Sequence, residues 1–269
     1  MVFVGPFLAF MVAVFLLPLA FIFFTSFVGE EFTFKYYYEV VSGRLYLLVL
    51  RNTLEITVTS ALATLLVSYP VAYHLSKQPP KRRFWLAMFV LLPFYTSILV
   101  KSFAFTVILG HNGIVNSILR NLFGPEAGVS LLFNRTGVII GLTHFLIPFM
   151  VFPILASLLA QNPGLEKAAE IMGAGPWRIF WRVTFPLSTP GVLAGVLLCM
   201  ILSMGTFVTP ALLGGRRDMM IANLVDFHIH DSLDWNTASA IAVVLLLMSG
   251  FFILVLARVR GGQLFGEGH

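Results

Sequence analysis

Long runs of apolar residues, separated by shorter polar segments, dominate the pattern of this chain. A membrane-spanning helix needs about 20 apolar residues to cross roughly 30 Å of hydrocarbon. The runs that reach this length occupy residues 2–28, 53–75, 84–109, 137–160, 190–213 and 237–257. They are continuous rather than alternating, which excludes a transmembrane β-barrel and favours helices. We therefore predict an all-α membrane protein with six transmembrane helices in a single domain, residues 1–269.

Charged residues are rare in this chain. They make up 11% of it, against 58% hydrophobic residues, whereas a soluble domain is about 25% charged. The single cysteine, Cys199, lies in an apolar run, which excludes an internal disulfide and a cysteine-based metal site and favours simple packing. The net charge of +5 comes from basic residues scattered among short loops, so no nucleic-acid partner is expected.

The predicted loops differ in their content of basic residues. Nine lysines and arginines lie in the second and fourth loops and after the last run, against seven in the opposite loops. Acidic residues show the reverse distribution, with three on the first side and eight on the other. Because cytoplasmic loops carry an excess of Lys and Arg, we predict that both termini and the fourth loop, residues 161–189, lie in the cytoplasm.

The fourth loop has the local signals of a short helix. Asn162 suits the N-cap, Pro163 suits the first helical position, and Gly173 is placed to end the helix about three turns later. A second helix is predicted to start at Pro176 and to end at Phe185-Pro186. The side chains of this second helix suit the headgroup level of a membrane, and they are Trp177, Arg178, Phe180, Trp181 and Arg182.

The apolar residues of the first loop helix recur at i, i+3, i+4 and i+7, which places them on one helical face. They are Leu165, Ala168, Ala169 and Met172. Glu166 and Glu170 lie off that face. Such a helix suits docking into the groove of a soluble partner, but it also suits a connector packed on its own bundle. Helix geometry alone leaves both interpretations open.

The fourth loop also carries a family signature. The stretch from Glu166 to Ala174, followed by Val183-Thr184-Phe185-Pro186, resembles the EAA loop of binding-protein-dependent ABC importer permeases. One position departs from that pattern, because Lys167 stands where the family has Glu and Glu166 lies one place earlier. The docking helix is therefore expected, but the family's polar contact at that position is not assumed. The resemblance implies that these residues couple to an ATPase: Glu166, Lys167, Ala168, Ala169, Glu170, Met172, Gly173 and Ala174.

A second resemblance, to the spermidine/putrescine branch of these permeases, covers most of the chain. It is carried by residues 92–101 (LPFYTSILVK), 113–116 (GIVN) and 207–215 (FVTPALLGG). It implies the type I importer permease fold, with six helices and a cytoplasmic coupling helix, in a bacterial inner membrane. It further implies a second related permease subunit, two cytoplasmic ATPase subunits that hold ATP and Mg, and an extracytoplasmic solute-binding protein. The expected cargo is a polyamine, with an opine, another amine or a phosphonate left open.

Polar residues in or beside the apolar runs are candidates for the transport pathway or its gate. They are Glu55, Tyr95, Lys101, Thr206, Thr209 and Pro210. On a straight helix from Phe84, Lys101 lies about 25 Å along, near the outer interface. A structural or gate-lining role is favoured for Lys101 over substrate contact, and Glu55 is hypothesised to neutralise it.

The fifth run has two further features. Gly191 and Gly195 have the spacing of a close helix contact. Beyond them, the polar residues, glycines and Pro210 between Ser203 and Gly215 predict a weakened outer end. Such a weakened end suits either pathway lining or simple kinking.

Two other classes of membrane protein fit the sequence less well. A secondary transporter couples to ions through buried acids, and no acid lies at the middle of a run. An intramembrane enzyme needs paired catalytic residues, whereas His74 and His144 lie on separate runs. His228 and His230 are two ligands without a third, so solvated loop histidines are expected there rather than a metal site. No phosphate-binding glycine-rich loop occurs, so we expect this chain neither to bind a cofactor nor to hydrolyse ATP.

Overall fold

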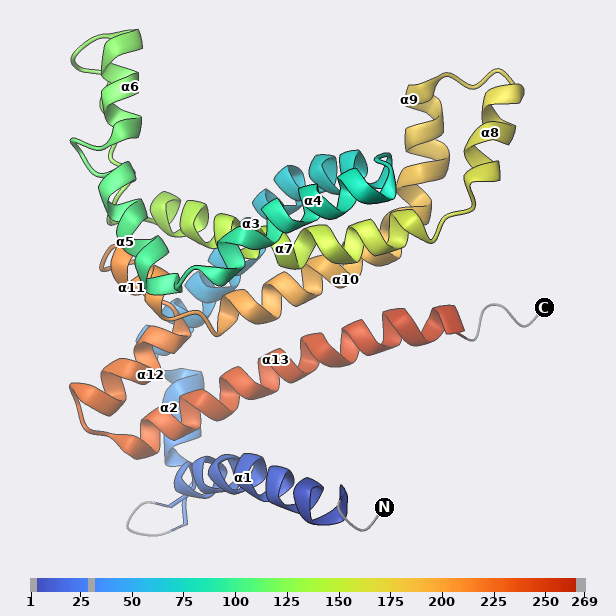
Figure 1. Ribbon diagram of the computed structural model, residues 1–269. Coiled ribbons are helices and arrows are strands. Elements are labelled where there is room, and N and C mark those ends of the chain that lie inside the picture. The colour runs from blue at the N-terminus through green and yellow to red at the C-terminus, as the bar shows by residue number, and fades with distance from the viewer. Residues whose placement is uncertain (1–3, 29–31, 265–269) are drawn as a thin grey trace.

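The computed structural model describes residues 4–28 and 32–264, which form helices joined by short loops, with no extended strand in those ranges (Figure 1). The helices long and apolar enough to cross a membrane are Arg44–Ser76, Ile98–Phe123, Arg135–Leu159, Pro176–Met204 and Trp235–Val255. In the first run, α1 (Val4–Thr25) contributes a shorter apolar stretch, Phe10–Thr25. The all-α membrane prediction is confirmed, while the count of six spans stays a prediction.

Three long helices form the main core. They are α3 (Arg44–Ser76), α7 (Arg135–Leu159) and α10 (Phe185–Met204). Along α7, Leu142, Leu146, Met150 and Ile154 recur every fourth residue and are fully buried. The glycines of α10 meet α7 closely, because a Cβ added at Gly191 would lie 2.5 Å from the Ser157 Cβ. The close contact predicted from the Gly191 and Gly195 spacing is therefore confirmed.

A second cluster of helices packs beside this core. It contains α2 (Lys35–Ser42), α12 (Ile221–His230) and α13 (Trp235–Leu264), with Val40, Leu224 and Ile241 buried between them. Helix α1 lies against α13, and α6 (Ile114–Phe123) projects away from the bundle (Figure 1). These peripheral helices leave many apolar side chains exposed.

The third apolar run, residues 84–109, does not form the single helix that we predicted. It divides into α4 (Pro80–Leu91), the 3₁₀ turn η1 (Leu92–Tyr95) and α5 (Ile98–Leu109). Pro93 has no backbone N–H with which to continue the helical hydrogen bonds. Thr96 and Ser97 have extended ψ angles of 139° and 135°. The chain changes direction there, and α5 leads into α6 instead of continuing α4 (Figure 1).

The fifth run is longer at its start than predicted and shorter at its end. Helix α9 (Pro176–Ile179), the π-helical turn η2 (Phe180–Thr184) and α10 follow one another without a break. The prediction that Phe185-Pro186 ends the second loop helix is thus wrong. Pro186 would interrupt the hydrogen bonds of a regular α-helix, but the wider π turn just before it lets the helix continue. At the other end α10 stops at Met204, and α11 (Val208–Leu213) follows after Gly205. The break between α10 and α11 confirms the predicted weakening at the end of the fifth run.

Candidate functional site

The first helix of the fourth loop is α8 (Pro163–Ile171), and its ends form as the sequence predicts. The Asn162 Oδ1 accepts a hydrogen bond from the Gly164 N–H at 2.8 Å, which caps the first turn. Gly173 has a φ of +79°, a conformation in which a side chain is strained. There the chain reverses, and the Gly173 and Ala174 N–H groups donate to Glu170 O and Ala169 O. Helix α8 thus ends by local signals and projects from the bundle beside α9 (Figure 1).

The residues of α8 divide between a buried side and an exposed side. Ala169 is only 8% exposed, whereas Ile171 is 87%, Met172 80% and Leu165 46% exposed. Lys167, Ala168 and Glu170 are exposed as well. The predicted stripe is therefore not one docking face, because Ala169 turns toward the bundle. We call Leu165, Ala168, Ile171 and Met172 the coupling surface, after the role that the resemblance of the fourth loop implies for this helix. Ile171 was missed because it lies off the i, i+3, i+4, i+7 series that starts at Leu165.

Glu166 faces the bundle and joins three segments. Its Oε2 accepts a hydrogen bond from the Lys77 Nζ at 2.5 Å, and its Oε1 accepts one from the Thr184 Oγ1 at 2.9 Å. Lys77 is the C-cap of α3, and Thr184 is the last residue of η2. Burial alone would raise the pKa of Glu166, but the two hydrogen bonds and the Lys77 charge outweigh it and lower that pKa. A hollow of about 360 Å³ opens beside these residues.

Aromatic side chains tie the second loop helix to α3. The Phe180 ring lies 5.8 Å from Tyr69 and 5.5 Å from Tyr73, measured between ring centroids. Trp181 packs on Phe180 at 5.2 Å, while Trp177 remains exposed. The second loop helix is thus held to α3 by apolar contacts, whereas α8 is held to the bundle by polar ones.

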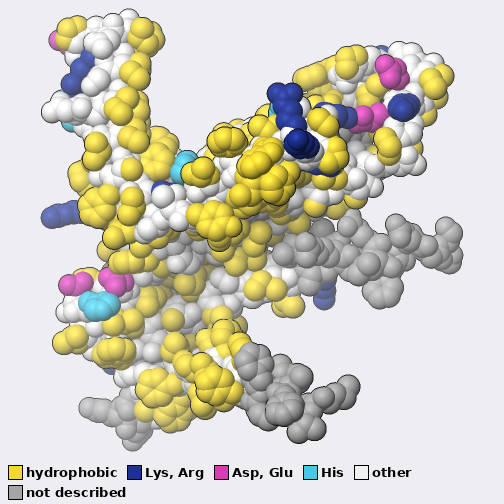
Figure 2. All heavy atoms as spheres, in the orientation of Figure 1, with side chains coloured by type: hydrophobic (Ala, Val, Ile, Leu, Met, Phe, Trp, Pro, Cys, Tyr) yellow, Lys and Arg dark blue, Asp and Glu magenta, His cyan; other side chains and the backbone are white. Residues whose placement is uncertain are grey.

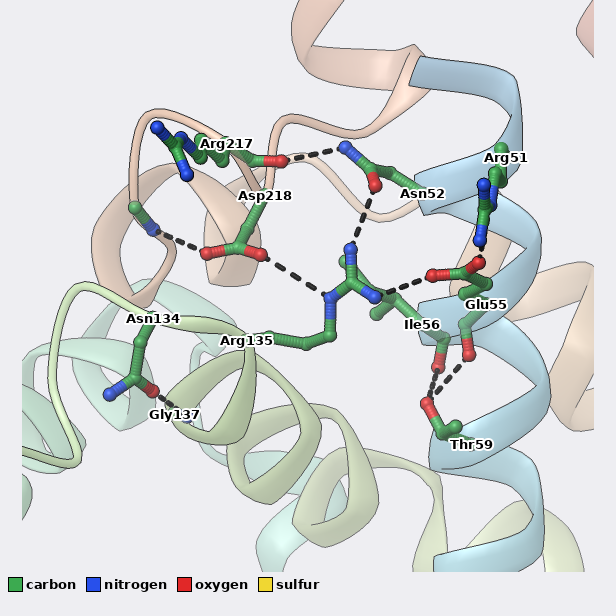
Figure 3. Close-up of polar contacts among 11 residues, drawn as sticks. Arg51, Asn52, Glu55, Ile56, Thr59, Asn134, Arg135, Gly137, Arg217 and Asp218 are labelled. Atoms are coloured by element: carbon green, nitrogen blue, oxygen red, sulfur yellow. Dashed lines mark hydrogen bonds and ion pairs between the residues drawn. The ribbon is translucent and has the colours of Figure 1, made fainter. Parts of the chain in front are cut away.

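A polar network lies near the opposite end of α3, and Figure 3 shows Arg135 at its centre. The Arg135 guanidinium donates to Glu55 Oε2 at 2.5 Å, to Asn52 Oδ1 at 2.7 Å and to Asp218 Oδ1 at 3.4 Å. The Asn52 side chain in turn donates to the Arg217 carbonyl at 2.6 Å. This network connects α3, the start of α7 and the loop between α11 and α12. Sequence reasoning counted Arg135 and Asp218 only as loop charges and did not single out Asn52.

Glu55 does not neutralise Lys101, so that hypothesis is wrong. Glu55 binds Arg51 at 2.6 Å as well as Arg135, whereas the Lys101 Nζ donates to the Pro93 carbonyl at 2.8 Å. The same ammonium group lies 5.4 Å from the centroid of the Phe145 ring. The straight-helix position estimated for Lys101 is also wrong, because the chain is broken between Tyr95 and Ile98. Lys101 therefore supports that break.

Among the described residues, the remaining pathway candidates make no side-chain hydrogen bond to the Arg135 network. Thr209 is buried and its Oγ1 lies 3.3 Å from the Ser102 Oγ, which joins α11 to α5. The Thr206 hydroxyl donates to the Leu202 carbonyl at 2.9 Å. Pro210 is buried in α11, and Tyr95 is exposed at the end of η1. No side-chain hydrogen bond or ion pair joins any two of the six candidates in the part of the chain that the structure describes.

The two histidines of the predicted outer loop lie in α12 and differ from each other. His228 is buried, stacks on Tyr46 and lies 3.0 Å from the Ser232 Oγ, so the expectation of a solvated side chain is wrong for it. His230 is exposed and lies beside Asp226. Among the residues that the structure describes, no three His, Cys, Asp or Glu side chains are placed to hold a metal ion.

Comparison of the sequence with known families gives one match over nearly the whole chain. Residues 2–261 match the model of the "binding-protein-dependent transport system inner membrane component" family. The chain is 33% identical over 233 residues to the spermidine/putrescine transport system permease protein PotB of Escherichia coli (strain K12), covering 87% of this chain and 84% of that protein. It is 33% identical over 223 residues to PotB of Haemophilus influenzae, covering 83% and 78% respectively.

Solved structures of low sequence identity share the fold. A chain of a bacterial alginate ABC transporter, in complex with an alginate pentasaccharide-bound periplasmic protein, superposes with a TM-score of 0.77 at 17% identity and covers 97% of this chain and 92% of that one. A chain of the MetNI methionine ABC transporter in an inward-facing conformation gives 0.59 at 19% identity, covering 82% and 98%. The helical arrangement is therefore that of ABC importer permeases.

Proposed function

This chain belongs to the family of binding-protein-dependent transport system inner membrane components, and we propose that it is the permease subunit of an ATP-driven importer for a polyamine such as spermidine or putrescine. Membership of this family makes the chain a multi-pass inner-membrane component of a transport system and not a catalytic enzyme. Energy then enters through contacts with other subunits, so the surface that receives those contacts is the functional site.

The coupling surface carries this proposal. Ile171 and Met172 are almost fully exposed at the tip of a short helix, while Glu166 and Ala169 hold the opposite side of that helix against the bundle. An apolar patch on a segment outside the membrane favours a partner that covers it. This arrangement supports docking over the alternative of a connector packed on its own bundle, since a connector would bury its apolar residues.

The partners that we propose follow from this surface and from the family. Two cytoplasmic ATPase subunits bind ATP and Mg, and one of them receives α8 in a groove. A second, related permease subunit and lipid contact the apolar side chains that α1 and α13 leave exposed. A solute-binding protein delivers the cargo at the opposite end. ATP binding closes the ATPase subunits, α8 moves with them, and the bundle switches the pathway between inward and outward access.

We propose that α8, α9 and both chain termini face the cytoplasm. In Figure 1 the start of α1 at Val4 and the end of α13 at Leu264 lie toward the same side as α8. Figure 2 shows Lys and Arg side chains gathered where α4 begins, next to α8 and α9, and acidic side chains over α12 at the other end. An excess of basic residues on one side supports the cytoplasmic assignment of that side.

Crosslinking tests the coupling role. Single cysteines can be introduced at Ala168 and Ile171 in the natural chain. Cys199 is fully buried, so it should add no background crosslink. We expect both positions to crosslink to an ATP-hydrolysing subunit in the assembled transporter. The matched control is a cysteine at Leu45, which is also exposed but lies at the other end of α3. Crosslinks from Leu45 alone, or from none of these positions, would refute the coupling role.

Uptake measurements test the cargo. Proteoliposomes that contain the whole transporter should accumulate labelled spermidine or putrescine only when ATP and the binding protein are both present. A thermal-shift panel of polyamines, opines, other amines and phosphonates on that binding protein gives an independent measurement. Stabilisation by an opine or phosphonate alone, with no polyamine uptake, would replace the proposed cargo while leaving the permease role intact.

A further inference from the structure

We propose that Glu166 is a positioning residue that transmits the movement of α8 to α3 and to the base of α10, and this inference rests on the proposed function. The Glu166 carboxylate uses one oxygen for Lys77 and the other for Thr184. It therefore holds α8 to two different long helices at once. We call Glu166, Lys77 and Thr184 the Glu166 clamp.

Helix α8 has few other attachments to the bundle. Ala169 is its one buried residue among those the structure describes, and a single alanine buries little apolar surface. The Gln161 side chain, just before α8, donates to the Thr184 carbonyl at 3.1 Å and reinforces the same junction. Apart from the short covalent connections to α7 and α9, the polar contacts of Glu166 are therefore the main attachment through which a force on the coupling surface reaches the bundle.

Both receiving helices extend far from α8. Helix α3 continues from Lys77 to Glu55, a span of about 33 Å at 1.5 Å per residue. At Glu55 it joins the Arg135 network, which also holds the start of α7 and the loop at Asp218. Helix α10 continues from Thr184 to Met204, where the chain breaks before α11. A displacement of α8 is thus carried to the opposite end of the bundle by rigid helices.

The position of Glu166 on α8 explains why its carboxylate contacts residues of this chain rather than facing outward. Successive residues of an α-helix point about 100° apart. Lys167 occupies the position that departs from the family pattern, and it is exposed. Glu166 is one residue earlier, and its carboxylate is turned to Lys77 and Thr184. This chain therefore uses Glu166 as an internal clamp, while Lys167 faces outward on α8.

The test measures transported cargo per ATP hydrolysed in proteoliposomes that contain the whole transporter. For Glu166→Gln and Lys77→Met we expect this ratio to fall by about 5-fold or more, the lower end of the typical range of allosteric coupling between two sites, while the ATPase subunits still co-purify. The matched controls are Lys81→Met, an exposed lysine at the start of α4, and Glu39→Gln, whose 3.9 Å ion pair with Lys35 lies in α2. Both controls should leave the ratio unchanged.

A charge-reversed pair separates transmission from loss of folding. Glu166→Lys combined with Lys77→Glu restores an opposite-charge contact, so it should recover much of the ratio that each single change loses. If Glu166→Gln prevents co-purification, recovery of both assembly and ratio in the reversed pair supports the clamp, and no recovery overturns it. An unchanged ratio in Glu166→Gln overturns it directly. A wild-type chain that fails to retain an ATPase subunit refutes the proposed function instead.

Discussion

Glu166 and Lys167 are neighbours in the sequence with opposite surroundings. Lys167 faces outward, whereas Glu166 is partly covered and hydrogen-bonded to Lys77 and Thr184. Arg135 behaves similarly, because its contacts with Glu55, Asn52 and Asp218 use the several donors of one planar guanidinium group. In both cases a charged side chain holds separate segments together, which a loop charge free in solvent would not do.

The lowered pKa of Glu166 predicts how the clamp responds to acid. A carboxyl group whose folded pKa lies below its ordinary value of 4.5 adds stability at neutral pH, and this stability is lost as the pH falls through the folded pKa. The Tm of the detergent-solubilised wild-type chain should therefore exceed that of Glu166→Gln by a constant amount above about pH 5.5, and the difference should shrink below about pH 4. A Tm difference that grows on acidification would contradict the assigned contacts.

At the scale of helices, two prolines act in different ways. Pro93 coincides with a true break, because it lies in η1, two extended residues follow η1, and Lys101 donates to the Pro93 carbonyl. Pro186 coincides with no break, because η2 shifts the hydrogen-bond pattern just before it. The proline residue by itself does not distinguish the two cases in the sequence. The contacts of the neighbouring helices decide which of them interrupts the chain.

Helix contact between α7 and α10 depends on the absence of a side chain at Gly191. In Gly191→Ala the new Cβ would lie 2.5 Å from the Ser157 Cβ and 2.6 Å from the Pro153 carbonyl oxygen. We expect a loss of about 1–3 kcal/mol, which lowers the Tm by about 2–10 °C. The control is Gly250→Ala in α13, where no atom lies within 4 Å of the added Cβ. Equal Tm values for the two variants would show that α7 and α10 are not in close contact.

At the scale of the whole molecule, α3 links the two polar sites. One end carries Lys77 beside α8, and the region toward the other end carries Asn52 and Glu55 beside Arg135. Between them, α3 buries a row of small hydroxyl side chains that permits close approach of its neighbours: Thr53, Thr57, Ser60, Thr64 and Ser68. A long helix fixed at both ends and closely packed between them suits the proposed role of carrying movement from the coupling surface across the bundle.

The sequence by itself determined the features that depend on neighbouring residues. Apolar runs longer than about 20 residues predicted membrane helices, and Asn162, Pro163 and Gly173 predicted the ends of α8 because capping is a local interaction. The family signature in the fourth loop likewise needed no tertiary information.

Only the tertiary structure decided which polar groups meet and which side of a helix is covered. Glu166 and Lys77 are 89 residues apart, and Arg135 and Glu55 are 80 apart. No periodicity within one segment specifies such pairs, because the partner of a charged side chain depends on how distant helices pack. For the same reason Ala169 turned inward and Ile171 outward against the predicted stripe, since neighbouring elements cover one side of a helix that the sequence alone leaves undefined.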